Sequence, residues 1–315
     1  MRRRSFLQFM AAGVAASAAE FRELTCDVAV IGGGTGGCAA ALGALRNGMT
    51  VVMTEETDWI GGQLTSQAVP PDEHPWIESF GRTRAYADYR NAVRDYYFRN
   101  YPLTAEARSR GAQLNPGDGS VSRLTHEPRV SLVVFENMLA PYVSGGRLTV
   151  LLRHKPAAAD VDRDSVRAVM VKSADTGLSR TIHAKYFVDA TEQGDLLPLT
   201  RTEYVTGFES RKQTSEPHAP EQAQPANIQA FTVCFAIDYR AGEDHTIDRP
   251  AEYTFWRDYV PQLKPAWPGK LLSWSMSDPI TLKARNVMFE PGCDASATGG
   301  PLCLWLYRRI ARAKN

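Results

Sequence analysis

Three glycines and one acid near the start of the chain have the types and spacing of a dinucleotide-binding site. Gly32, Gly34 and Gly37 follow a short apolar run, and Glu55 ends the next apolar run. In such a site the first glycine makes a tight turn, the second lets a pyrophosphate approach the backbone, and the third lets a helix pack on a strand. The acid contacts a ribose and disfavours a 2′-phosphate. The pattern therefore predicts a site for the adenosine diphosphate half of a dinucleotide that has no phosphate on the ribose 2′-hydroxyl.

A second glycine pair, Gly61 and Gly62, follows Glu55 after a short polar stretch. Glycine at these positions predicts either a tight turn or another close approach between backbone and ligand.

Proton-transfer groups are harder to assign. His74 and His126 are the histidines nearest to these motifs, and imidazole moves protons near neutral pH. Structural and surface roles compete with this interpretation for each histidine. The neighbouring acids Asp72, Glu73 and Glu127 are interpreted as ordinary loop acids. The catalytic residues therefore stay unassigned, with His74 and His126 as candidates.

Metal chemistry is not expected. The five cysteines show no CxxC pair or close cluster, which argues against a zinc or iron–sulfur site. Cys293 and Cys303 could pair in an oxidising compartment, but two separate buried thiols are the favoured interpretation.

The elements around the glycines predict a βαβ unit. Residues 28–31 form a short apolar strand, residues 38–47 an Ala- and Leu-rich helix that stops at Gly48, and residues 50–54 a second strand. This order places the glycines between a strand and a helix N-terminus, where backbone N–H groups favour phosphate.

Further elements follow along the chain. Tyrosines recur at helical spacing between residues 79 and 101, with Arg84, Arg90, Arg94 and Arg99 mostly on other faces, so we expect an amphipathic helix with a solvated face. Residues 129–142 predict a helix that is apolar on most sides and buried. Three strands, with a hairpin or meander among them, are expected at residues 148–152, 166–172 and 181–188.

The N-terminus has the features of an export signal. A basic start, a mildly apolar run over residues 6–16 and a small-residue site at Ala16-Ser17-Ala18 predict a signal peptide over residues 1–18. Cleavage of the signal peptide removes Arg2, Arg3 and Arg4 and changes the net charge from +1 to −2. A chain with this near-neutral charge lacks the excess of basic residues that is typical of nucleic-acid binding. The segment Arg3-Arg4-Ser5-Phe6-Leu7-Gln8 resembles a twin-arginine signal, although an ordinary secretion signal is the alternative. We therefore expect a periplasmic or extracellular protein with no membrane span once the signal is removed.

Two stretches resemble a known family. The run DVAVIGGGTGGCAAALGALRNGMTVVMTEETDWIGGQLTSQ and the later run YFVDATEQGDLLPL are similar to the bacterial FAD-dependent oxidoreductases that have a glutathione-reductase-like fold and are related to the heterodisulfide reductase A subunit. The resemblance implies FAD held at Gly32, Gly34, Gly37 and Glu55, with Gly61, Gly62, Ala190 and Thr191 near the cofactor. Glu192 stands where that family has a glycine. Arg129 is similar to an arginine that begins the helix behind the flavin, and a helix-start salt bridge is its alternative role.

The expected fold class is α/β. A Rossmann-like, glutathione-reductase-type FAD-binding domain is expected over residues 25–199, with a helical insertion at about 76–120, and an incomplete α+β substrate domain over 200–315. Residues 299–315 read as a basic helical run, and the expected return to the nucleotide domain is missing, which indicates a C-terminally truncated member. The predicted function is flavin-mediated redox chemistry on a small organic substrate, with the electron acceptor unassigned. An NAD-dependent dehydrogenase and an inactive dinucleotide-binding fragment are the alternatives.

Overall fold

The computed structural model describes residues 23–229, 231–263, 266, 269–278, 281, 283–293 and 301–312. The predicted signal peptide lies outside these residues. The described chain forms two compact units, the first from residues up to 69 together with 128–235, and the second from residues 70–127 together with those from 236 onward. No helix among the described residues is long and apolar enough to cross a membrane.

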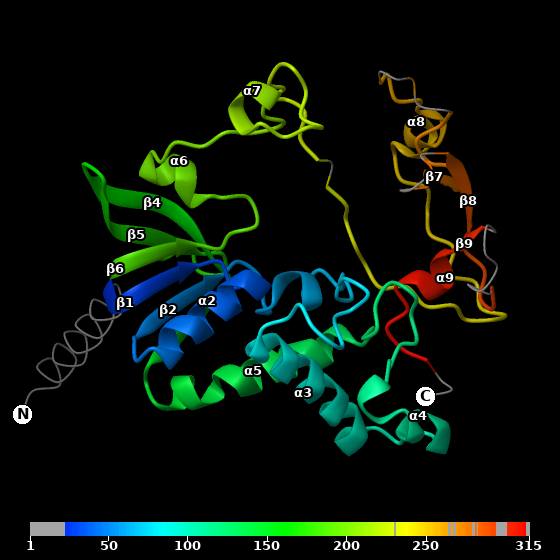
Figure 1. Ribbon diagram of the computed structural model, residues 1–315, viewed down its shortest axis with the longest axis horizontal. Coiled ribbons are helices and arrows are strands. Elements are labelled where there is room, and N and C mark those ends of the chain that lie inside the picture. The colour runs from blue at the N-terminus through cyan, green and yellow to red at the C-terminus, as the bar shows by residue number, and fades with distance from the viewer. Residues whose placement is uncertain are drawn as a thin grey trace, which may run out of the picture. The chain divides into compact units, whose positions relative to one another are not determined.

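The first unit is built on a six-stranded sheet with the order β3-β2-β1-β6-β5-β4 (Figure 1). Its four strands β3-β2-β1-β6 are parallel, with Val28 of β1 aligned to Val51 of β2 and Tyr186 of β6. The other two pairings, β5 with β6 and β4 with β5, are antiparallel. The strands are β1 (Glu23–Ile31), β2 (Val51–Glu55), β3 (Leu148–Leu152), β4 (His154–Asp162), β5 (Ser165–Ser173) and β6 (Ser179–Asp189).

The helices of this unit cover the parallel strands. Helix α2 (Thr35–Arg46) packs on β1 and β2 (Figure 1), and α5 (Pro128–Ser144) packs on β3. The predicted strand, helix and strand around the glycines are therefore confirmed, and Gly48, with φ +86°, follows the helix as expected. Helix α5 is buried through Val130, Ser131, Val134, Phe135 and Leu139, so only part of its surface faces the core. The short elements of the first unit are η1 (Gly62–Leu64), α6 (Leu196–Thr200) and α7 (Arg211–Thr214).

One strand of the sheet was not predicted. The segment HKPAAADVD forms β4 at the edge of the sheet, where its register against β5 shifts between Pro156 and Ala158. Proline removes a backbone donor and alanine has little strand preference, so the sequence carries no strand signal here. An edge position tolerates the proline because one side of the strand needs no ladder partner.

The second unit contains α3 (Arg84–Asn100), which is amphipathic as predicted, but the expected solvation of its arginines is wrong for two of them. Arg90 and Arg94 are buried, at 1% and 3% exposure. Arg90 forms ion pairs with Glu73 and Glu78, and Arg94 pairs with Glu78. We call these four residues the arginine cluster. Buried charges persist only when opposite charges and hydrogen bonds compensate them, and here the partners come from the segment before the helix.

Glu73 is consequently more than the ordinary loop acid that the sequence indicated. Its carboxylate is 4% exposed and also accepts hydrogen bonds from Tyr86 Oη at 2.5 Å and Ser122 Oγ at 3.1 Å. Glu127 similarly accepts from the hydroxyl groups of Tyr97 at 2.9 Å and Tyr101 at 2.7 Å. Both acids therefore organise the packing around α3.

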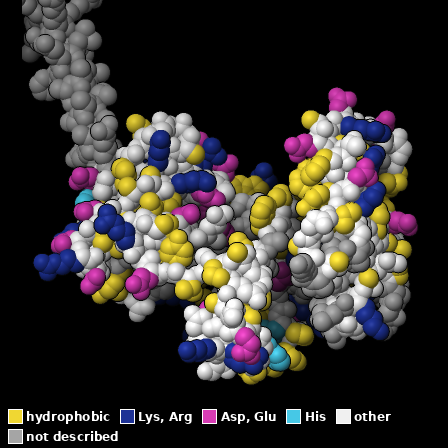
Figure 2. Space-filling view, turned by 90° about the horizontal axis from the view of Figure 1, so that it is seen from above, with side chains coloured by type: hydrophobic (Ala, Val, Ile, Leu, Met, Phe, Trp, Pro, Cys, Tyr) yellow, Lys and Arg dark blue, Asp and Glu magenta, His cyan; other side chains and the backbone are white. Residues whose placement is uncertain are grey.

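The remaining elements of the second unit are short. They are α4 (Ala105–Ser109), η2 (Gly111–Gln113), α8 (Tyr253–Asp258), β7 (Ser275–Ser277), β8 (Ala284–Met288), β9 (Leu302–Cys303) and α9 (Leu304–Tyr307). The last three strands form a small sheet with the order β7-β8-β9. On the face drawn in Figure 2, basic and acidic side chains are interspersed, in keeping with the balanced composition.

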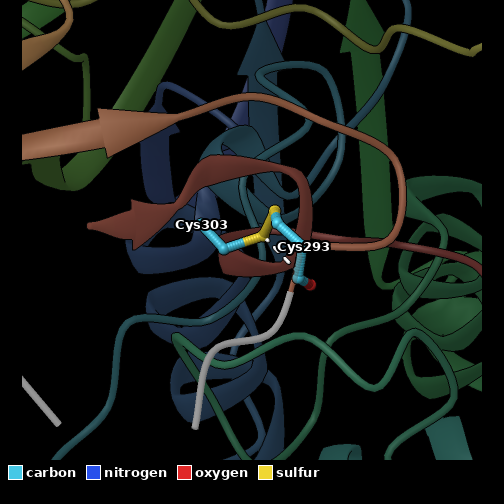
Figure 3. Close-up of a disulfide and its surroundings, with 2 residues drawn as sticks. All are labelled: Cys293 and Cys303. Atoms are coloured by element: carbon cyan, nitrogen blue, oxygen red, sulfur yellow. Dashed lines mark hydrogen bonds between the residues drawn. A yellow bond between two sulfur atoms is a disulfide. The ribbon is translucent and has the colours of Figure 1, made fainter. Parts of the chain in front are cut away.

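Two expectations about the C-terminal region are wrong. The basic run is not one long helix, since α9 ends at Tyr307 and Arg309 instead donates to the carbonyl oxygens of Gly117 and Asp118 at 2.7 and 2.9 Å. Cys293 and Cys303 are not separate thiols but form a disulfide (Figure 3). Pairing of β8 with β9 helps to bring the two cysteines together, with their Cα atoms 5.9 Å apart.

Candidate dinucleotide-binding site

The glycine loop, residues 32–37, joins the end of β1 to the start of α2. Gly32 has φ +105°, and a Cβ atom there would lie 2.1 Å from the carbonyl oxygen of Ala190. A Cβ atom on Gly37 would lie 2.0 Å from the carbonyl oxygen of Gly32. Side chains at Gly32 and Gly37 are thus excluded by the protein's own backbone, which is how a helix comes to pack closely on a strand.

Gly34 differs from its two neighbours in the motif. Among the described residues other than its chain neighbours, a Cβ atom on Gly34 would meet Glu192 Oε1, at 3.2 Å, and the Cα of Gly62, at 4.0 Å. The protein's own backbone packing therefore leaves room at Gly34 that a ligand could use. Gly34 is also the N-cap of α2, where no side chain caps the helix, so no capping side chain competes with an anion for the N–H groups of the first turn. This combination fits the pyrophosphate of a dinucleotide.

The second glycine pair supports the loop from behind. The N–H of Gly61 donates to the carbonyl oxygen of Gly33 at 2.8 Å, and Thr35 Oγ1 donates to the carbonyl oxygen of Gly61 at 2.7 Å. Gly61 has φ +103°, and a Cβ atom there would lie 2.8 Å from the Phe135 ring. Gly62 is close enough to Gly34 that its own Cβ would lie 3.0 Å from the Gly34 Cα. These contacts explain the pair as a tight turn packed on the loop.

Glu55 lies at the end of β2 and is 5% exposed. Its Oε2 accepts from the Gly33 N–H at 3.1 Å, and its Oε1 accepts from the N–H and the hydroxyl of Thr57, both at 2.8 Å. A carboxylate has about four acceptor positions, so these bonds orient the group without exhausting it. Glu55 also lines the pocket described below, where it can accept from a ribose hydroxyl.

A third segment reaches the loop from the end of β6. Asp189 holds the turn that follows it, because its Oδ1 accepts from the N–H and hydroxyl of Thr191 at 3.1 and 2.7 Å, and its Oδ2 accepts from the N–H of Leu196 at 3.0 Å. The N–H of Ala190 donates to the carbonyl oxygen of Ile31 at 2.7 Å. Asp189 thereby positions Ala190 and Thr191 beside Gly32.

These segments enclose one pocket, to which β4 contributes its first residues. The pocket is lined by Gly32, Gly34, Thr54, Glu55, Glu56, His154, Lys155, Pro156, Ala190, Thr191, Glu192, Gln193 and Asp195. Of the residues expected near the cofactor, Gly32, Gly34, Glu55, Ala190 and Thr191 are brought together here. Gly37, Gly61 and Gly62 support the loop without lining the pocket.

The part of the pocket that β4 lines was not predicted from the sequence. His154, Lys155 and Pro156 come from a strand that lacked a strand signal, and Asp189 and Asp195 were noticed only as parts of a motif. No residue of β4 is buried, and intermediate and exposed residues alternate along it with one interruption, so burial gives the strand no apolar alternation that the sequence could show.

Arg129 does not line this pocket. It lies in the first turn of α5, exposed, with its guanidinium 5.2 Å from the centre of the Trp59 ring, a cation–π contact. The structure thus shows a stacking partner for Arg129, and its predicted contact with the cofactor stays a prediction.

The two candidate histidines belong to the second unit. His126 is 3% exposed, its Nδ1 donates to the carbonyl oxygen of Leu124 at 2.9 Å, and burial lowers its pKa to about 4, so the ring is neutral near pH 7. His74 donates from Nε2 to the carbonyl oxygen of Gly81 at 3.3 Å and accepts from the N–H of Trp76 at 3.2 Å. Both rings therefore have structural hydrogen bonds, and neither lines the pocket at the glycine loop.

Two further features define the chemistry of the loop. Burial raises the pKa of the Cys38 thiol to about 12, with the Glu55 charge adding to the effect, so the thiol stays protonated. Within the described residues there is no group of three or more His, Cys, Asp or Glu side chains arranged to hold a metal ion. The site therefore offers backbone N–H groups and carboxylates, which suit a phosphate and a ribose.

The parallel-rich sheet and the glycine loop between β1 and α2 define a mixed α/β protein with a Rossmann-like fold. The profile of the FAD dependent oxidoreductase family matches residues 27–298, and the chain belongs to this family, whose cofactor is FAD. No curated protein sequence matches the chain.

Three enzymes are among the solved structures to which the chain is similar. The glycerol-3-phosphate dehydrogenase from Bacillus halodurans, complexed with FAD, is 17% identical with a TM-score of 0.36, and the match covers 64% of this chain and 45% of that one. L-proline dehydrogenase from P. horikoshii is 20% identical with a TM-score of 0.29, over 54% and 23%. The myxobacterial chondrochloren halogenase, described as FAD-dependent, is 17% identical with a TM-score of 0.34, over 53% and 37%. The chain spans less than half the length of each, and their substrates do not transfer to it.

Proposed function

We propose that this protein binds FAD at the glycine loop and uses it to oxidise or reduce a small organic molecule. The observation that carries the proposal is the room that the backbone leaves at Gly34, beside a helix N-terminus with no side-chain cap, in a chain of the FAD dependent oxidoreductase family. FAD supplies the redox chemistry when bound, and the protein supplies binding and orientation. Gly34 and the first turn of α2 would hold the pyrophosphate, and Glu55 the adenosine ribose. The relation to the heterodisulfide reductase A subunit is part of this proposal.

The visible absorption spectrum of the purified protein tests the cofactor. We expect flavin bands, and heat release followed by chromatography should yield FAD. A folded, colourless protein that binds NAD on titration would favour the dehydrogenase alternative. A folded protein that binds neither dinucleotide would contradict the proposal and favour an inactive fragment.

Substitution of the loop glycine makes this test specific to the site. In Gly34→Val the side chain would stand where the pyrophosphate approaches, so we expect FAD binding to be lost while the protein still folds. Gly43→Val is the matched control, because Gly43 lies in the same helix and a Cβ atom there meets nothing within 4 Å. Retained binding in Gly34→Val would show that the loop is not the cofactor site.

We also propose export by the twin-arginine route to the periplasm or beyond. The basic start with Arg3 and Arg4 supports this, as does the disulfide between Cys293 and Cys303, since disulfides persist in oxidising compartments. Replacing both arginines by lysine should leave the precursor in the cytoplasmic fraction. Unchanged export of this variant would contradict the proposed route.

A further inference from the structure

Glu192 occupies an unusual place beside the glycine loop. It lies in the turn after β6 that Asp189 holds in place, and its side chain is exposed. Its Oε1 would be 3.2 Å from a Cβ atom on Gly34 and 3.1 Å from one on Gly62. Among the described residues other than the chain neighbours of Gly34, no other side-chain atom comes within 4 Å of that position. The carboxylate therefore stands on the face of Gly34 that a pyrophosphate has to approach.

The charges around this position do not compensate Glu192. The pocket lining contains four carboxylates, those of Glu55, Glu56, Glu192 and Asp195, and one lysine, Lys155. The lysine is already engaged, since its Nζ lies 2.6 Å from Glu56 Oε2. The attraction for a pyrophosphate must come mainly from backbone N–H groups at the start of α2, and a carboxylate close to them opposes it.

From this placement we propose that Glu192 is an affinity determinant that weakens the binding of the pyrophosphate group, so that the dinucleotide is held reversibly. This inference rests on the proposed function, because it assigns a role within the same site. A bound pyrophosphate requires the Glu192 side chain to swing toward solvent, which its exposure allows. A neutral side chain at this position removes the repulsion, and a glycine removes the obstruction as well.

The experiment compares the wild-type chain with Glu192→Gln and Glu192→Gly, each freed of bound flavin, by calorimetric titration with ADP, FAD and adenosine. We expect both variants to bind ADP and FAD about tenfold more tightly at low ionic strength, with a smaller gain at high salt because the charge is exposed. Adenosine has no phosphate, so its affinity should not change. Glu203→Gln is the matched control, since Glu203 is exposed in the same unit and does not line the pocket.

Each other result has a definite meaning. Equal affinities for ADP in wild type and both variants would overturn this inference and leave the dinucleotide site intact. Weaker binding in Glu192→Gln would also overturn it, because Glu192 would then be accepting a hydrogen bond from the ligand. If no form of the protein binds ADP or FAD, both the proposed function and this inference fail. A gain that includes adenosine equally would show that the effect is not on the phosphates, which again contradicts the inference.

Discussion

The glycine loop and the arginine cluster both place polar groups in the interior, but they do so by opposite means. The loop is formed where side chains are absent, since Gly32 and Gly37 face backbone atoms at distances that no Cβ atom tolerates. The cluster is formed by long side chains, with Arg90 and Arg94 buried against Glu73 and Glu78. The loop depends on backbone that lies close along the chain or in a neighbouring strand. The arginine cluster depends on ion pairing, because an arginine or glutamate that is buried without its partner carries a large desolvation cost. We therefore expect substitutions that add a side chain to destabilise the glycine loop, and substitutions that remove a charge to destabilise the arginine cluster.

The largest effect is expected from added volume at Gly37. In Gly37→Val the new side chain collides with the carbonyl oxygen of Gly32. Because this oxygen belongs to the backbone, it cannot move away as the end of a flexible side chain could. We expect the free energy of unfolding to fall by more than about 4 kcal/mol. Urea denaturation measures the change against Gly43→Val, where a side chain meets open space. A loss within about 1 kcal/mol of that control would mean that α2 does not pack on β1 as closely as described.

Lost charge in the arginine cluster should be nearly as costly. Glu73→Gln leaves the buried Arg90 guanidinium without one of its two carboxylates, and Arg90 Nε already has no hydrogen-bond partner among the described residues. We expect a loss of about 3–5 kcal/mol in the free energy of unfolding. Asp95→Asn is the control, because Asp95 pairs with Arg99 at 3.8 Å on the surface and should contribute less than about 0.5 kcal/mol. Equal effects of the two substitutions would remove the distinction between buried and exposed pairs.

The pH dependence of stability sharpens the picture of the second unit. His126 has a pKa of about 4 because of burial, whereas an unfolded histidine titrates near its usual value of about 6.5. Below about pH 6.5 the histidine is protonated in the unfolded chain but not in the folded one, which favours unfolding. The free energy of unfolding therefore decreases as the pH falls from about 6.5 to 4, by up to about 3 kcal/mol. Denaturation at a series of pH values should show a flatter curve for His126→Gln. Parallel curves for the two proteins would contradict the burial of a neutral ring.

The smallest effect is expected at Glu55, whose side chain contacts the glycine loop, and it concerns the affinity for ADP. Glu55→Ala removes the acceptor proposed for the ribose, and we expect ADP binding to weaken by about 1–3 kcal/mol. Thr57→Val is the control, because it removes a hydrogen bond to Glu55 while the carboxylate stays. Calorimetry with ADP compares the wild type and the two variants after bound flavin has been removed. An equal loss in both variants would mean that Glu55 acts by holding the loop and not by contacting the ligand.

Much of the first unit could be predicted because its signals are local. The apolar run before Gly32, the alanine-rich helix after it and the strand ending at Glu55 follow one another along the chain, and each carries its own pattern. The strands at residues 148–152, 165–173 and 179–189 were placed within about two residues, as expected when apolar runs are bounded by polar turns. The oxidoreductase family follows from the same local motifs.

What the sequence could not provide are arrangements between distant segments. Arg90 meets Glu73 across 17 residues, and nothing in the helical pattern of α3 identifies a carboxylate in an irregular segment as its partner. The pocket combines the ends of β1, β2 and β6 with the start of β4, and Pro156 conceals that last strand. The disulfide also depends on the pairing of β8 and β9, which are too short to carry a periodic signal.

The burial of Cys38 makes the protein its own reporter of loop motion. Its thiol is 3% exposed and stays protonated, with Sγ 3.4 Å from the carbonyl oxygen of Gly33. A maleimide reagent can therefore modify it only during transient opening of the segment that joins β1 to α2. The labelling rate at Cys38, resolved by peptide mass from Cys26 and Cys234, gives the frequency of that opening. Any ligand seated on the loop slows the labelling, whatever its colour or activity.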